Sequence, residues 1–79
     1  MMEAEAAILD LLSKRAPGAT FCPSEAARAM APEDWRRRMD EVRAAGARLA
    51  AEGRLSVLQS GEPVDPSTAT GPIRYGAPR

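Results

Sequence analysis

The spacing of apolar residues changes at Gly53, and this change limits the chain to folds that combine helices with strands. Before Gly53, apolar or small residues recur at steps of four, three, four and three, as along one side of a helix: Trp35, Met39, Val42, Gly46 and Leu49. After Gly53 the period is two, because Leu55 and Val57 share one side of the chain. Glycine also commonly ends helices. We therefore expect an α+β fold in which a helix is followed directly by a strand.

Prolines divide the chain before Gly53 into three predicted helices. The first has apolar residues at helical spacing and stops at Pro17, the second opens on Pro23, and the third opens on Pro32. Their expected spans are about residues 3–16, 23–30 and 32–52. The short, proline-containing link between the second and third helices is typical of a helix-turn-helix.

A hairpin is predicted after the third helix, with strands at about residues 54–60 and 72–76. The segment 61–72 between the strands contains three prolines and two glycines, so we expect it to be a loop. If Gln59 lies opposite Ile73, then Val57 faces Tyr75, and the larger apolar residues of both strands share one side. The side that covers the helices then consists of Leu55, Val57, Ile73 and Tyr75.

In this register Leu58 points outward, away from the helices. Residues 20–22 are β-forming and are expected to add a third strand to the hairpin. The resulting order of elements is that of a winged helix, with a three-helix core, a small antiparallel sheet and segment 61–72 as the wing. The main alternative is a three-helix bundle followed by a disordered tail.

Two residues on the apolar stripe of the third helix carry specific expectations. Gly46 lies on the buried side, which suggests that another backbone, that of the first or second helix, crosses close to it. Trp35 is interpreted as a residue of the core or its edge, because it lies on the same stripe. A stacking platform for a nucleic-acid base is the alternative for Trp35.

Length and composition exclude several classes of protein. The 79 residues can form one domain, expected to span residues 1–79, and the eleven basic and eleven acidic residues balance. With no histidine and a single cysteine, we expect no metal, no cofactor and no internal disulfide, and a reducing cytoplasm as the location. The acidic start and the lack of a long apolar run predict neither export nor a membrane partner.

Enzymatic activity is not expected. Neighbouring carboxylates such as Glu33 and Asp34 diverge on a helix instead of converging on a substrate, and no histidine is present to activate a nucleophile. The sequence also contains no glycine-rich phosphate loop.

Four separated blocks of the sequence, CPSEAARA at 22–29, APEDWR at 31–36, AAEGRL at 50–55 and GPIR at 71–74, resemble DUF3253, a bacterial family of domains of unknown function. The resemblance runs from about Ile8 to Tyr75. It implies a winged-helix-like fold and a bacterial source. It assigns no functional residues.

The strongest candidate for a functional site is the run of arginines on the third helix, because this helix of a winged helix usually enters the major groove of DNA. We predict that duplex DNA is bound through Arg36, Arg37 and Arg43, with Arg54 or Arg74 of the hairpin assisting.

The alternative interpretation of the same arginines is a solvated helix face. Residues 32–53 contain five arginines and five acids, and Glu33 with Arg37, Asp34 with Arg38 and Glu52 with Arg48 have the spacing of helical ion pairs. On this view Arg37 and Arg48 both point directly outward.

A protein-interaction module is therefore the second functional hypothesis. A protein partner or a second copy of the chain would contact the small residues Ala44, Ala47 and Ala51 or the outward Leu58. The neutral net charge and the acids Glu62 and Asp65 in the wing support this second hypothesis.

Overall fold

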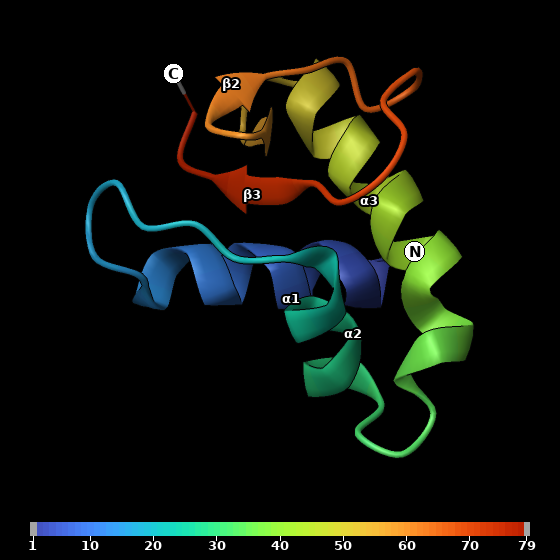
Figure 1. The fold of residues 1–79 in the computed structure, drawn as a ribbon. Coiled ribbons are helices and arrows are strands. Elements are labelled where there is room, and N and C mark those ends of the chain that lie inside the picture. Colours follow the sequence, from blue (N-terminus) through green and yellow to red (C-terminus); the bar gives the residue numbers. More distant parts are fainter. Residues whose placement is uncertain (1, 79) are drawn as a thin grey trace.

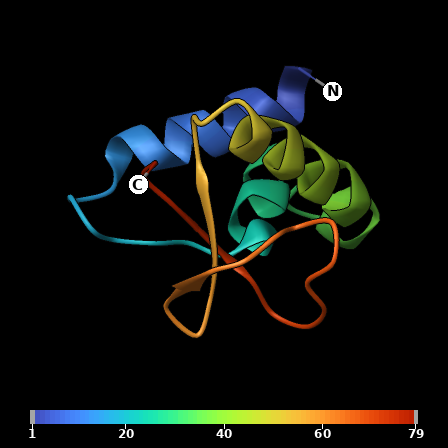
Figure 2. The ribbon, with the colours of Figure 1, turned by 90° about the horizontal axis from the view of Figure 1, so that it is seen from above.

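The computed structural model describes residues 2–78 and has an α+β winged-helix-like arrangement (Figure 1). Its helices are α1 (Met2–Lys14), α2 (Pro23–Met30), the 3₁₀ helix η1 (Trp35–Arg38) and α3 (Met39–Ala51). Its strands are β1 (Ser56–Gln59), β2 (Glu62–Pro63) and β3 (Arg74–Gly76). α1 contacts both α2 and α3, and the sheet lies across these helices (Figures 1 and 2).

The start of the third helix differs from the continuous helix expected over 32–52. Residues 32–34 form a turn, in which the backbone N–H of Asp34 donates to the carbonyl of Ala31 at 3.1 Å. The chain then winds as η1 and becomes α-helical only at Met39. The first N–H groups of a helix have no partners within the helix, and a tight 3₁₀ turn is common at helix N-termini.

The sheet has the strand order β2-β1-β3, and its register confirms the predicted pairing of Val57 with Tyr75. The β-forming stretch at 20–22 contributes a single bridge instead of a full strand. Phe21 and Tyr75 exchange two backbone hydrogen bonds, of 3.0 and 2.7 Å, at the free edge of β3. These hydrogen bonds therefore join the link between α1 and α2 to β3.

β2 lies inside the segment that was expected to be only a loop. Gln59 pairs with Glu62, so two residues, Ser60 and Gly61, make the turn. Both have positive φ, 53° and 81°, as the tight turns of two-residue hairpins require. The Ser-Gly pair directly after an alternating strand is the sequence signal for this hairpin.

The core joins the predicted face of the hairpin to the helices. Leu55, Val57, Ile73 and Tyr75 are all buried there. The ring of Phe21 packs edge-on against that of Tyr75, with ring centroids 5.7 Å apart. Ile8 of α1 and Leu49 of α3 complete this layer.

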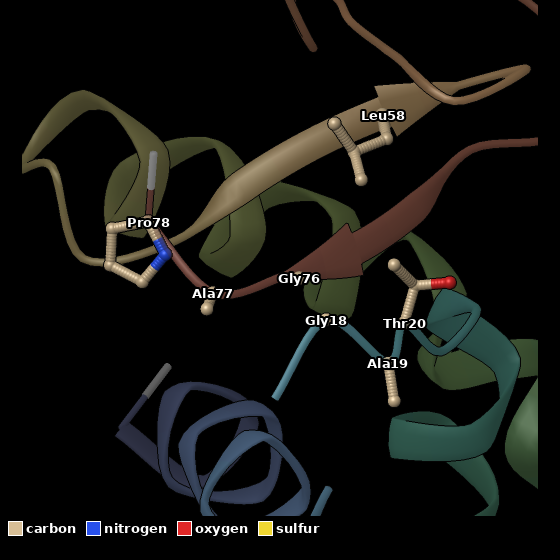
Figure 3. A pocket seen from close by; sticks show the side chains of 7 residues that line it. All are labelled: Gly18, Ala19, Thr20, Leu58, Gly76, Ala77 and Pro78. Atoms are coloured by element: carbon tan, nitrogen blue, oxygen red, sulfur yellow. The ribbon is translucent and has the colours of Figure 1, made fainter. Parts of the chain in front are cut away.

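Leu58 is buried, with only 6% of its surface exposed, although the sequence predicted that it points outward. It does lie on the side of β1 opposite to Val57, but chain segments distant in sequence cover that side. Leu58 lines a small pocket together with the α1–α2 link and the residues after β3 (Figure 3). The predicted outward position of Leu58, on which its proposed contact with a partner depended, is therefore wrong.

Gly46 packs against the side chain of Tyr75. The sequence suggested that the backbone of another helix would cross there, and this expectation is wrong. A Cβ atom built on Gly46 would lie 2.5 Å from Cζ of Tyr75 and closer still to its hydroxyl oxygen. The fully buried ring of Tyr75 occupies the space that any other residue at position 46 would fill. The missing side chain therefore allows β3 to pack on α3.

Candidate nucleic-acid interface

The exposed side of η1 and α3 carries the three arginines that the sequence singles out. Arg36, Arg37 and Arg43 are all exposed, and the side chain of Arg37 is exposed by 82%. Arg37 has a loose ion pair with Asp34, with the nitrogen and oxygen 3.7 Å apart. Within residues 2–78, neither Arg36 nor Arg43 forms an ion pair with a carboxylate.

Trp35 is half-buried at the start of η1 and packs against the core, and two arginines stack on its ring. The guanidinium carbon of Arg28, from α2, lies 4.3 Å from the ring centroid, and that of Arg36 lies 4.5 Å away. We call this cluster the Trp35 stack (Arg28, Trp35 and Arg36). Cation–π attraction of this kind favours arginine over the face of tryptophan.

Two other arginines of the third helix connect it to α1 instead of facing outward. Arg38 donates to Glu41 at 2.9 Å and to Glu3 of α1 at 2.6 Å, and both hydrogen bonds raise the pKa of Arg38. The hydrogen bond from Arg38 lowers the pKa of Glu41. Arg48 lies 3.4 Å from Glu5 of α1.

The sequence predicted that Arg38 pairs with Asp34 and that Arg48 pairs with Glu52, and both predictions are wrong. The predicted outward direction of Arg48 is also wrong. The acids of α1 reach these arginines because α1 packs alongside α3. Ion pairs therefore neutralise the α1-facing side of the helix, whereas Arg36 and Arg43 on the other side have no carboxylate partner in the described part of the chain.

The two hairpin arginines do not share one position. Arg54 lies in the turn after α3, 3.5 Å from Glu52, at the opposite end of the helix from Arg36. The helical rise places Arg54 and Arg36 roughly 25 Å apart along the axis. Arg74 lies on β3 and donates two hydrogen bonds to Thr20, to its side-chain oxygen at 2.7 Å and its carbonyl at 2.9 Å.

The wing between β1 and β3 is acidic. Residues 61–73 contain Glu62 and Asp65 and no lysine or arginine. The backbone N–H and the hydroxyl of Ser67 both donate to the carboxylate of Asp65, at 2.9 and 2.7 Å, and these bonds lower its pKa. The wing consequently keeps its negative charge at neutral pH.

Arg43 also influences the core beside it. Burial raises the pKa of Tyr75 to about 12, and the positive charge of Arg43 acts in the opposite direction. The hydroxyl of Tyr75 has no hydrogen-bond partner among the described residues. Tyr75 thus fills space beneath α3 as a neutral ring and offers no polar group to a ligand.

A pocket on the other side of the sheet has little chemistry to offer. Its lining consists of Gly18, Ala19, Thr20, Leu58, Gly76, Ala77 and Pro78 (Figure 3). None of these side chains titrates, and the volume of about 180 Å³ is below the range of roughly 300–1,000 Å³ typical of ligand pockets. Over residues 2–78 no cluster of three or more potential metal ligands occurs. None of the helices in this range has both the length and the apolar character needed to cross a membrane.

Arg28 is the one residue of this surface that the sequence did not indicate. It lies on α2, seven positions before Trp35 and across a turn, so helical periodicity does not relate the two residues. Only the folded turn at 32–34 brings them together. An exposed arginine at the end of a helix, followed by a proline turn and a tryptophan, is the signal that could have found it.

The sequence model of a family described as "Protein of unknown function (DUF3253)" matches residues 2–78, nearly the whole chain. The comparison with curated proteins finds no match.

Proposed function

The chain belongs to the DUF3253 family of proteins of unknown function, and from the surface described above we propose that it binds duplex DNA through the exposed side of η1 and α3. The observation that carries this proposal is that Arg36 and Arg43, on the helix that follows the turn, have no carboxylate partner among residues 2–78. Arginines left exposed and unpaired can bind phosphates and base edges without first breaking an ion pair.

The positions of the arginines along η1 and α3 also favour DNA binding. In a helix-turn-helix the second helix lies in the major groove, with its N-terminal residues nearest the bases. Arg36 and Arg37 lie at that end, and Arg43 lies farther along. Ala44 is exposed and leaves room for close approach of a sugar-phosphate backbone.

The hairpin contributes little to this proposed interface. The acidic wing repels phosphate, and Arg54 lies at the far end of α3. Arg74 is exposed and keeps its charge while it bonds to Thr20, so it is the hairpin residue better suited to assist. We therefore expect affinity to depend mainly on the helix and to fall steeply with salt.

The test is binding of a labelled mixed-sequence duplex at low salt, followed by fluorescence anisotropy. The Arg36→Ala, Arg37→Ala double variant should bind at least tenfold more weakly, whereas Lys14→Ala on the far end of α1 should bind nearly as the parent chain does. Absence of salt-sensitive binding to any duplex would refute the proposal. Concentration-dependent self-association in place of DNA binding would favour the protein-interaction alternative.

A further inference from the structure

We infer that the Trp35 stack is a clamp for a backbone phosphate of the bound duplex, formed by Arg28 and Arg36 and held in place by the ring of Trp35. This inference rests on the proposed DNA binding and adds to it a contact that involves α2. It also gives Trp35 the role of a positioning residue, because Trp35 acts through the two arginines.

The two arginines of the Trp35 stack have unused hydrogen-bonding capacity. Neither guanidinium donates a hydrogen bond or forms an ion pair within residues 2–78, although each has five N–H donors. Each guanidinium carbon lies over the ring, and both arginines are exposed, so N–H groups of each guanidinium remain available. Such N–H groups bind the oxygens of a phosphate in a bidentate manner.

The Trp35 stack also holds two permanent positive charges close together. Both guanidinium carbons lie within 4.5 Å of one ring centroid, so they are at most about 9 Å apart, inside the screening length of roughly 10 Å at 0.1 M salt. The two charges repel each other when the site is empty. An anion that contacts both guanidinium groups offsets this repulsion, and the contact with the ring limits the side-chain freedom that binding would otherwise restrict.

The location of the stack favours duplex DNA as the source of that anion. In a helix-turn-helix bound in the major groove, the first helix crosses the DNA backbone and the start of the second reaches the groove. Arg28 lies on α2 and Arg36 on η1, on the two sides of the turn. A phosphate at that crossing is within reach of both residues, and the base edges in the groove are left to Arg37 and Arg43.

The experiment compares the salt dependence of duplex binding for the parent chain, Arg28→Ala, Trp35→Phe and Lys14→Ala. Arg28→Ala should weaken binding about tenfold, equally for duplexes of unrelated sequence, and should reduce the slope of log affinity against log salt by about one. Lys14→Ala removes the same charge from an exposed site on α1 and should change neither quantity by as much. Trp35→Phe keeps an aromatic face and should retain most of the affinity.

Trp35→Leu removes the aromatic face and should reproduce the loss seen for Arg28→Ala. Because Trp35 also packs against the core, the thermal unfolding of this variant is measured in parallel. Arg28 is exposed, so Arg28→Ala is expected to fold normally and decides the outcome even if Trp35→Leu does not fold. The fluorescence of Trp35, the only tryptophan of the chain, should change on titration of the parent chain with duplex.

The outcomes separate the two levels of the proposal. If Arg36→Ala with Arg37→Ala weakens binding while Arg28→Ala leaves affinity and salt slope unchanged, the clamp is refuted and the DNA-binding function stands. If single strands bind more tightly than duplexes, and loss of Trp35 weakens binding while loss of Arg28 does not, the ring is a base-stacking platform and the clamp is refuted. If the parent chain binds no duplex at all, both proposals fail.

Discussion

Replacement of Gly46 by alanine should destabilise the domain, although alanine is the better helix former. The added Cβ would meet the ring of Tyr75, with 2.5 Å to Cζ and 2.9 Å to Cε1, whereas carbon atoms pack at about 3.5–4.0 Å. The ring is fully buried and in contact with Phe21, so it has no free space to move into. Overpacking of a core costs about 1–3 kcal/mol, and this contact belongs at the upper end.

Helix propensity offsets part of that cost, by about 1 kcal/mol. The net loss for Gly46→Ala is therefore about 2 kcal/mol, which lowers Tm by roughly 8–16 °C in a domain of this size. Ala44→Gly is the matched control, because Ala44 is exposed on the same helix. It should lose only the propensity difference, about 1 kcal/mol.

Urea unfolding followed by circular dichroism measures both variants. Tyr75→Phe should not rescue Gly46→Ala, since Cζ and Cε1 remain in place. Tyr75→Leu shortens the side chain and should make the double variant less destabilised than the sum of the two single changes. A Gly46→Ala chain as stable as the parent, or more stable, would refute the packing of Tyr75 on Gly46.

Two further predictions concern ionisable groups. Burial raises the pKa of Tyr75 to about 12, so between about pH 10 and 12 its hydroxyl ionises in the unfolded chain but not in the folded one. The free energy of unfolding should therefore not depend on Tyr75 below about pH 10 and should fall as pH rises towards 12, by at most about 2–3 kcal/mol. Unfolding measured against pH checks this, and the same fall in Tyr75→Phe would contradict it. Glu62→Gln should tighten duplex binding by up to about fivefold at low salt and by less at high salt, since it removes a negative charge from the wing. Equal affinity at every salt concentration would mean that the wing lies too far from the DNA to influence it.

The sequence was sufficient for the features that local patterns specify. Alternation of apolar residues predicted the pairing of Val57 with Tyr75, because a slip of one residue would turn every buried side chain of the strand outward. The α+β winged-helix arrangement followed from the order of helical and alternating segments together with the prolines between them.

The features that the sequence did not predict depend on segments that meet only in the folded chain. Leu58 is buried because the α1–α2 link and the residues after β3 cover it. Arg38 and Arg48 form ion pairs with acids of α1, and residue spacing within one helix cannot predict pairs between two helices. Arg28 reaches Trp35 across a turn that changes the direction of the chain. For the candidate site, sequence reasoning therefore named the arginines of the third helix and missed the contact that joins α2 to them.

A titration of the isotopically labelled chain with duplex DNA, followed residue by residue by NMR, tests the central claim most directly. If the duplex binds at the Trp35 stack and α3, the signals of Arg28, Trp35, Arg36 and Arg43 shift together, and the shifts disappear as salt is added. Shifts confined to the pocket around Leu58, shifts that do not respond to salt, or no shifts at all would contradict it.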